Sequence, residues 1–485
     1  MKKSIFLSFI TVFCAITWLS AQQPDLQYFR KWNKEGINVF EPSKTDKQPE
    51  FTGIKVRIGG AFTQDFQYLT HENVPTYQAV SGVNKNLLYG LKDKSKDSAS
   101  ATLSGFNLAM ANLNLDIQIE DGIRVCLENY MSARHHSEFW VKGGYIQMDK
   151  LPMFGNPEWF TNKFRVKIGH FQPNFGDMQF RRSDGGNTMF NAFGENLILD
   201  AFTTEIGSEI YAFPAEGLMI MGGLSSGFIS GNIVQPSDAV NSSGVVATKR
   251  TPSVFGKVAY DKVFNNTRFR LSASIYNNSN SSRNTLFAGD RTGSHYFGVM
   301  EPATINGLPT SIGTSNTGQG GPNFTSGRFD PGVANRVTAI CINPFIKTGG
   351  LEFFGGYTNI KGSVYSDISG TGLTKSWIKR GWDQLNAELI YRFLPNEQMY
   401  IGARYVQAKG EPSGMKYSEA DNGKTSGQQA KVTMNRTAIA AGWFPTKNML
   451  LKGEYVVQGY KDFPVRDYRN QGKFSGFMVE AVIGF

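Results

Sequence analysis

Basic residues recur singly along this 485-residue sequence, at polar positions between apolar ones. Arg165 and Lys167 flank a valine, and Arg181 and Arg182 follow a short distance further on. Residues two apart in an extended strand share one face, so bases spaced in this way would line one surface of a sheet. A confined surface of positive charge attracts and selects anions. The chemistry that these residues offer is electrostatic, with no bond made or broken.

Motifs for covalent or metal chemistry are weak in comparison. His135-His136 lacks the second histidine four residues away and the glutamate of a zinc protease, and neither a P-loop nor a C-x-x-C motif occurs. Cys126 and Cys341 are expected to be wall residues rather than a disulfide pair. Bases dispersed singly along strands also argue against nucleic-acid binding. We therefore expect no enzyme, no metal and no cofactor, although alternation alone does not test for the lipid-level Ser/His pair of an outer-membrane phospholipase.

Residues 1–21 have the organisation of a secretory signal peptide. Lys2 and Lys3 precede an apolar stretch, and Ser20-Ala21 offers a cleavage site of small residues. The stretch is short for a membrane anchor, which is the alternative, and Cys14 lies inside it rather than at the cleavage point of a lipoprotein. Cleavage after Ala21 would remove both lysines and lower the net charge from +10 to +8.

Several segments alternate apolar and polar residues with the period of two of a strand that has one apolar face. Two such runs flank Asp121-Gly122, which is a strong hairpin signal. The same unit recurs around 261–266, 394–397 and 445–448, and strands joined by such short turns are antiparallel neighbours. The stretches 281–335 and 410–431 are long and polar instead.

Short connections at one end and long ones at the other are typical of outer-membrane β-barrels. An extracellular β-sandwich or solenoid would also alternate, but no repeat of fixed period occurs. Aromatic residues gather where strands meet short turns, as in a membrane-interface girdle: Tyr260, Tyr391, Phe393 and Trp443. The last strand, 477–485, is apolar at every odd position and ends in Phe485. This ending resembles the signal by which the barrel-assembly machinery recognises outer-membrane proteins.

The chain length sets the size of the barrel. A membrane-crossing strand takes about 9 to 11 residues, and 16 strands would each have roughly 29 residues of the mature chain with their share of loop. We therefore expect an all-β fold, a transmembrane antiparallel β-barrel of about 16 strands, with 14 or 18 as alternatives, short periplasmic turns and long extracellular loops. A polar N-terminal segment, 22–50, would precede the barrel, 51–485.

Residues between the lipid-facing ones would line the lumen, where bases outnumber acids, and this predicts a modest anion preference. The alternative for any single base is that it neutralises an acid on the adjacent strand and stiffens the wall. The candidate pore-lining, anion-attracting residues are Lys55, Arg57, Arg124, Arg165, Lys167, Arg181, Arg182, Arg268, Arg270, Arg392, Arg404 and Arg436.

One segment departs from the alternation. The strand Phe164–Ile168 is followed by the pattern G-x-F-x-P-x-F-G over 169–176. This cluster resembles the phosphate-selective porin family (porins O and P), in which a similar strand leads toward a loop folded into the pore. The resemblance implies a 16-stranded homotrimeric channel for anions or small solutes. It also implies an inward-folded loop near 172–200, with Arg181 and Arg182 facing the permeant ion; the alternative places both arginines outside, against lipopolysaccharide phosphates.

The expected function is that of an outer-membrane porin, a passive diffusion channel for small hydrophilic solutes with a modest preference for anions, phosphate among them. Its location would be the outer membrane of a Gram-negative bacterium. Its partners would be outer-membrane lipid and lipopolysaccharide, the barrel-assembly machinery, further copies in a homotrimer, and small anionic or neutral solutes. One alternative is a surface binding protein that presents 281–335. The other is a transporter of hydrophobic solutes of the fatty-acid-transporter type, which would need an apolar lumen and an N-terminal plug, whereas 22–50 is short and polar.

Overall fold

The computed structural model describes residues 23–485 except 76, 81–82, 87, 92–99, 133–138, 184–186, 228–250, 282, 289–292, 303–325, 365–367, 370–375 and 378–379. The expected signal peptide, 1–21, and His135-His136 lie outside the described residues. Within the described ranges, no helix is long and apolar enough to cross a lipid bilayer.

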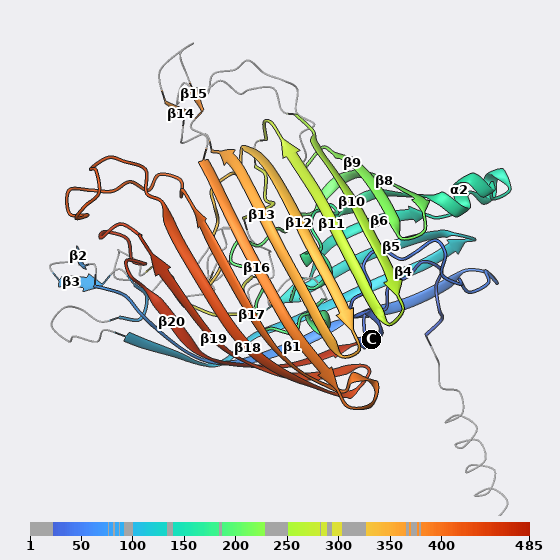
Figure 1. The fold of residues 1–485 in the computed structure, drawn as a ribbon, viewed down its shortest axis with the longest axis horizontal. Coiled ribbons are helices and arrows are strands. Elements are labelled where there is room, and N and C mark those ends of the chain that lie inside the picture. Colours follow the sequence, from blue (N-terminus) through green and yellow to red (C-terminus); the bar gives the residue numbers. More distant parts are fainter. Residues whose placement is uncertain are drawn as a thin grey trace, which may run out of the picture.

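The chain forms a closed barrel of 16 antiparallel strands, which confirms the predicted fold class and strand number (Figure 1). Each strand pairs with its neighbours in sequence, and β1 closes the barrel by pairing with both β4 and β20. The wall consists of β1 (Lys55–Glu72), β4 (Ser100–Glu120), β5 (Ile123–Ser132), β6 (Trp140–Met148), β7 (Phe164–Phe171), β8 (Glu205–Ala215), β9 (Leu218–Ser225), β10 (Ser253–Phe264), β11 (Thr267–Asn278), β12 (Arg336–Thr348), β13 (Leu351–Ser363), β16 (Arg380–Phe393), β17 (Met399–Gly410), β18 (Val432–Thr446), β19 (Met449–Lys461) and β20 (Lys473–Gly484).

Burial along the strands is inverted relative to a water-soluble protein. On β19, Leu451 and Val457 are 37% and 40% exposed, whereas the residues that follow them, Lys452 and Gln458, are 4% and 0% exposed. The other strands also expose apolar residues outward, and their inward faces carry polar and charged side chains together with apolar ones. An outward apolar band is what a wall in contact with lipid requires, because lipid tails offer no hydrogen bonds to polar side chains.

Short turns join the strands at one end of the barrel and long loops at the other (Figure 1). Asp121-Gly122 joins β4 to β5 as expected, with Gly122 at a φ of 74°, a conformation that favours glycine. The turn between β10 and β11 is shorter than the sequence indicated, because the strands extend to Phe264 and from Thr267. One connection at the short-turn end is longer and contains the helix α2 (Glu158–Lys163). Two small hairpins, β2 (Tyr77–Val80) with β3 (Val83–Asn86) and β14 (Ile368–Ser369) with β15 (Ser376–Trp377), lie in long loops.

The two ends of the wall meet beside the C-terminus. Phe485 exchanges two backbone hydrogen bonds with Gly60, at 3.1 and 3.2 Å. Its ring stacks on Phe62, with 6.1 Å between ring centroids. The last residue therefore belongs to the seam at which β20 closes on β1.

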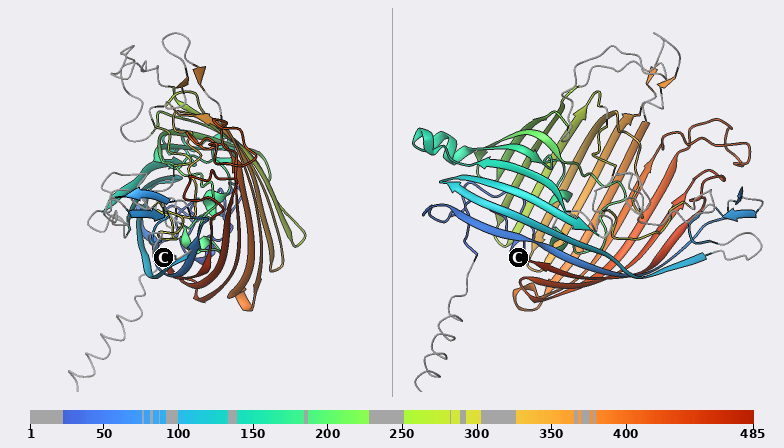
Figure 2. Two further views of the ribbon diagram at one scale, coloured as in Figure 1. Left: turned by 90° about the vertical axis from the view of Figure 1, so that its left-hand side faces the viewer. Right: turned by 180° about the vertical axis from the view of Figure 1, so that it is seen from behind.

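Three segments outside the wall occupy the lumen (Figure 2). They are the N-terminal segment, 24–49, the loop 172–204 between β7 and β8, and the described parts of the loop 279–335 between β11 and β12. The loop 172–204 buries apolar residues against inward side chains of the wall, and Tyr400 on β17 donates a hydrogen bond of 2.9 Å to the carbonyl of Ala192. The lumen is thus packed with protein over part of its length.

Candidate functional site: the charged lumen

The N-terminal segment crosses the short-turn mouth of the barrel. Its side chains contact one turn or strand end after another around the rim. The sequence offered no periodic signal for this placement, because the segment has no regular secondary structure beyond the turn Lys34–Gly36. The main contacts join Gln27 to Asp121, Lys34 to the carbonyl of Glu397, Asn38 to Glu352, and Lys44 to Asp149.

A cluster of five buried charges fixes the loop 172–204 to the wall. Arg181 contacts Glu352 on β13 at 2.7 Å and Glu388 on β16 at 3.1 Å. Arg392 binds Glu352 at 3.0 Å, and Arg404 binds Glu388 at 2.8 Å. Three arginines therefore share two carboxylates, which leaves this cluster with a formal charge excess of one arginine.

A second cluster lies on the wall strands β10 and β11. Asp177 of the loop binds Lys257 at 2.6 Å and Arg270 at 2.8 Å, and Glu41 of the N-terminal segment binds the same two bases at 3.0 and 2.7 Å. Burial raises the pKa of both acids, but Arg270 and Lys257 outweigh it: the pKa of Glu41 falls to about 2, and that of Asp177 lies well below its usual range. Both acids are thus charged at neutral pH, and the four groups join loop, N-terminal segment and wall.

The third cluster joins the two inward loops to each other. Arg182 and Arg328 bind Asp200 at 2.6 and 3.1 Å, and Arg328 also binds Glu195 at 2.7 Å. Burial raises the pKa of Glu195, but Arg328 and other bases outweigh it and lower this pKa to about 2. No sequence pattern indicated this cluster, because Arg328 and Glu195 lie in loops without alternation.

A fourth cluster fixes the loop 279–335 at the seam of the barrel. His295 Nδ1 lies 2.6 Å from Glu480 on β20 and 3.3 Å from Asp65 on β1. Lys452 on β19 binds the other oxygen of Glu480 at 2.5 Å and donates to carbonyl groups of the loop 172–204. All four side chains are at most 2% exposed.

Most of the remaining predicted bases are also paired. Arg124 binds Asp116 on the adjacent strand, and Arg268 binds Asp261 at 2.6 Å. Lys167 lies 3.9 Å from Glu209. These pairs correspond to the alternative in which inward bases neutralise neighbouring acids and stiffen the wall. Arg165 binds Asp149 at 2.8 Å, and Lys55 at the mouth donates to the carbonyl of Glu50.

Arg57, Arg436 and Arg30 differ from these paired bases, because within the described ranges their hydrogen bonds go only to neutral acceptors. Arg57 donates to the carbonyl of Pro24 at 3.2 Å. Arg436 donates to Gln458 and to loop carbonyl groups. Arg30, which the sequence did not single out, donates to the carbonyl groups of Gly36 and Phe180 at 2.9 and 2.8 Å. Neutral acceptors stabilise a guanidinium without cancelling its charge.

The sequence predicted that Arg181 and Arg182 face the permeant ion, with the outer surface as the alternative. In the structure they face neither open water nor the outside. Both are 1% exposed inside the barrel. Two arginines beside a permeant ion would have their charge screened by water and passing anions. Instead Glu352, Glu388 and Asp200 compensate it, because burying a charge without a partner costs far more than pairing it.

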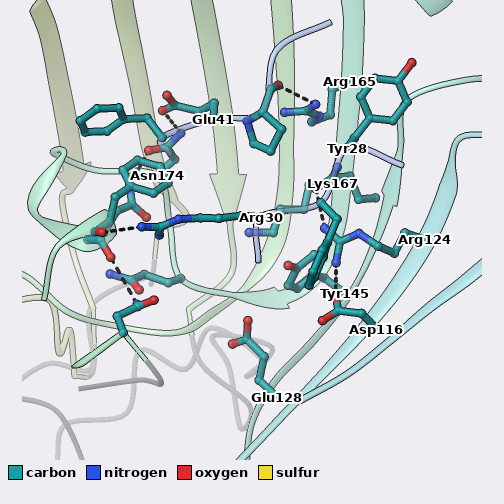
Figure 3. Close-up of a pocket in the computed structure, with 18 of the residues that line it drawn as sticks. Tyr28, Arg30, Glu41, Asp116, Arg124, Glu128, Tyr145, Arg165, Lys167 and Asn174 are labelled. Carbon is teal, nitrogen blue, oxygen red and sulfur yellow. Dashed lines mark hydrogen bonds and ion pairs between the residues drawn. The ribbon is translucent and has the colours of Figure 1, made fainter. Parts of the chain in front are cut away.

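A cavity of about 180 Å³ lies in the lumen between the N-terminal segment, the loop 172–204 and the wall from β4 to β8 (Figure 3). Its lining is mixed in character, with five bases, three acids and eight aromatic side chains. The bases are Arg30, Arg124, Lys142, Arg165 and Lys167, and the acids are Glu41, Asp116 and Glu128. A cavity in this position can hold water and a small polar solute.

Comparison with solved structures finds several similar chains at low sequence identity. The chain is similar to the outer membrane channel DcaP of Acinetobacter baumannii, with 12% identity and a TM-score of 0.48 over 90% of this chain and 99% of that one. It is similar to OmpT of Vibrio cholerae, with 9% identity and a TM-score of 0.44 over 90% and 99% of the two chains. It is also similar to OprB of Pseudomonas putida, with 11% identity and a TM-score of 0.44 over 88% of this chain and 94% of that one. At these values no conclusion about function follows from the similarity.

No family model matches the sequence, and no curated protein matches it.

One further motif, Gly223-x-Ser225-x-Gly227, has the spacing of a hydrolase nucleophile elbow. The structure does not support that role. Ser225 ends strand β9 instead of occupying a strand-to-helix turn, and its hydroxyl donates to Glu205. Within the described ranges no histidine contacts Ser225, so the motif lacks the base that a serine nucleophile needs.

Cys126 and Cys341 are buried and unbridged.

Proposed function

We propose that this protein is an outer-membrane porin, a passive diffusion channel for small hydrophilic solutes with a modest preference for anions. One observation carries the proposal: a closed barrel has an apolar outward face and a charged inward face that encloses a polar cavity. Such a wall is stable in lipid, and its inner surface can replace part of the hydration shell of a passing solute.

The anion preference rests on charges that the ion pairs leave uncompensated. Arg30, Arg57 and Arg436 have only neutral hydrogen-bond acceptors within the described ranges, and the Arg181 cluster has one arginine in excess. Inward bases that are neutralised by neighbouring acids contribute little to the field in the lumen. The preference is therefore expected to be modest, because few of the predicted bases act as uncompensated charges.

The finer proposals rest on the sequence. The resemblance of 169–176 to the phosphate-selective porins supports phosphate as one permeant anion and a homotrimer as the assembly. The apolar outward face supports outer-membrane lipid as its surroundings, with lipopolysaccharide at the long-loop rim. The amphipathic strand β20 and the terminal Phe485 support assembly by the barrel-assembly machinery.

A transporter of hydrophobic solutes gains one argument from the structure, because the N-terminal segment does enter the barrel, with Tyr28 and Phe40 buried. The charged clusters around the lumen argue against it, since an apolar solute would have to desolvate them. The charged lumen favours a channel for hydrophilic solutes over a surface binding protein as well.

Planar-bilayer recording of the purified protein tests the proposal. A porin gives steady ohmic conductance without added ligand. In a potassium chloride gradient, the reversal potential is expected to have the sign of a channel in which chloride is more permeant than potassium. A protein that inserts but shows no conductance would contradict the channel function. Cation selectivity would contradict the anion preference and leave the channel function in place.

A further inference from the structure

The lumen cavity has the size of a ring-shaped solute. Its volume is about 180 Å³, and an engineered protein cavity of roughly 150 Å³ accepts benzene. The N-terminal segment forms one side of the cavity, and inward residues of β4 to β8 form the opposite side. One six-membered ring with a small substituent fits this volume.

Aromatic side chains form much of the cavity wall. Tyr145 from β6 and Phe202 from the loop 172–204 line it together with Tyr28 and Phe29 from the N-terminal segment. All four rings lie beside cations, and two of the contacts come from lysines of the wall: Lys167 Nζ is 4.3 Å from the ring centroid of Tyr145, and Lys142 Nζ is 4.5 Å from that of Phe202. Flat apolar surfaces next to cations favour a solute that has both a ring and a negative charge.

Arg30 supplies a cation without a carboxylate partner in the described part of the chain. Figure 3 shows its side chain across the middle of the cavity, with Lys167 and Tyr145 on one side and Asn174 on the other. Its guanidinium donates to two carbonyl groups and lies 3.9 Å from the ring centroid of Phe190. Glu41 acts on this charge without forming an ion pair with it, so the guanidinium keeps hydrogen-bonding capacity and charge for an incoming carboxylate.

Lys167 is the second available cation. Its only carboxylate partner in the described ranges is Glu209, at 3.9 Å. Glu209 is already engaged by the hydroxyl of Tyr211 at 2.6 Å and the backbone N–H of Asn174 at 2.7 Å. Lys167 can therefore turn toward a ligand without leaving Glu209 unsatisfied, and Lys142 also acts on Glu128, the other acid that Lys167 faces.

We propose that this cavity is a binding site for a monocyclic organic carboxylate, an inference that rests on the channel function proposed above and adds the class of solute. The carboxylate pairs with Arg30 and Lys167, and the ring lies against Tyr145 and the aromatic residues beside it. A simple inorganic anion would use the cations but not the aromatic walls. A neutral ring would leave both cations uncompensated, and Glu128 on the same wall disfavours dianions.

Isothermal titration of the full-length protein in detergent tests the site independently of conductance. The probes are benzoate and glucuronate, which share a ring and a carboxylate, together with acetate and cyclohexanol, which each have one feature only. Binding of benzoate or glucuronate about tenfold tighter than acetate and cyclohexanol supports the inference, and the preferred one of the two identifies the ring as aromatic or sugar-like. Equal affinity for acetate, or no binding of either ring acid, overturns it.

Arg30→Gln and Lys167→Gln test the assignment of the cations, with Arg466→Gln in an exposed loop as the matched control. Each of the first two is expected to weaken binding of the ring acid about tenfold, and the control to leave it unchanged. Heat-modifiable migration in electrophoresis establishes that each variant is folded. Two cation variants are used so that the test still stands if one of them fails to fold. Unchanged affinity in a folded cation variant overturns the assignment. If the protein conducts but binds no ring acid, this inference alone is refuted. If it binds ring acids but never conducts, the channel function is refuted.

Discussion

Arg181 and Glu352 lie 171 residues apart in sequence and form an ion pair of 2.7 Å in the interior of the barrel. Arg181 belongs to the inward loop and Glu352 to β13, so this contact joins a segment that crosses the lumen to the wall around it. Asn38 of the N-terminal segment donates to the same carboxylate at 2.6 Å. Three parts of the chain that share no secondary structure therefore meet at one acid.

Replacing Glu352 with glutamine is expected to lower the free energy of unfolding by about 3–5 kcal/mol, because it leaves Arg181 and Arg392 buried without this partner. Urea unfolding of the purified protein in lipid vesicles measures the change. Glu216→Gln is the matched control: Glu216 pairs with Lys262 at 3.2 Å, but it is 71% exposed, and the loss should be at most about 1 kcal/mol. Equal losses in the two variants would mean that the Arg181 cluster does not hold the loop.

The barrel could be predicted from the sequence for two reasons. A strand with one apolar face has a period of two, and a short turn makes the two strands that it joins antiparallel neighbours. Ion pairs between adjacent strands follow from the same register. Arg404 on β17 lies directly opposite Glu388 on β16, and the two side chains bind at 2.8 Å. Pairs of this kind were foreseen as an alternative for each inward base.

The contents of the lumen could not be predicted, because loops have no periodicity and their contacts are distant in sequence. Nothing in the sequence near Asp177 indicates that it binds Arg270, 93 residues away. The N-terminal segment was expected to be merely polar, yet Phe40 is buried, with the guanidinium of Arg270 4.2 Å from its ring centroid. Inward arginines thus accept aromatic as well as acidic partners, and alternation does not distinguish the two.

Stability is expected to depend on pH through His295. Burial opposes its protonation, but Asp65 and Glu480 outweigh burial and hold the pKa of His295 well above its usual value; Glu195 also faces this residue. Because this pKa is raised on folding, the contribution of His295 is complete below about pH 6.5 and is lost as pH rises through the native pKa. The melting temperature of the wild type should therefore exceed that of His295→Gln at mildly acidic pH, and the difference should shrink at alkaline pH. A difference that does not vary with pH would show that His295 is uncharged in the native state.

Deleting Phe485 is expected to reduce the folded fraction in the outer membrane severalfold, because the residue takes part in the seam between β20 and β1. The deletion removes the ring stacked on Phe62 and both backbone hydrogen bonds that Phe485 makes with Gly60. Phe485→Tyr should assemble normally, since it keeps an aromatic ring and the backbone contacts. The heat-modifiable fraction in purified membranes, set against total synthesis, measures assembly. Normal assembly of the deletion would exclude a role of the terminal residue in recognition or closure.

Ion selectivity should respond to the inward arginines that have neutral partners. Arg57 is 6% exposed, points into the barrel near the mouth and donates to the carbonyl of Pro24, and Asp116 opposite it on β4 is bound to Arg124 instead. Arg57→Gln is expected to move the reversal potential in a potassium chloride gradient toward the cation side. Lys409→Gln is the matched control, because Lys409 is an exposed base near the long-loop end of β17 and its field is screened over about 10 Å at 0.1 M salt. It should leave the potential unchanged. If the two variants shift the potential equally, selectivity reflects the net charge of the protein rather than the lumen arginines.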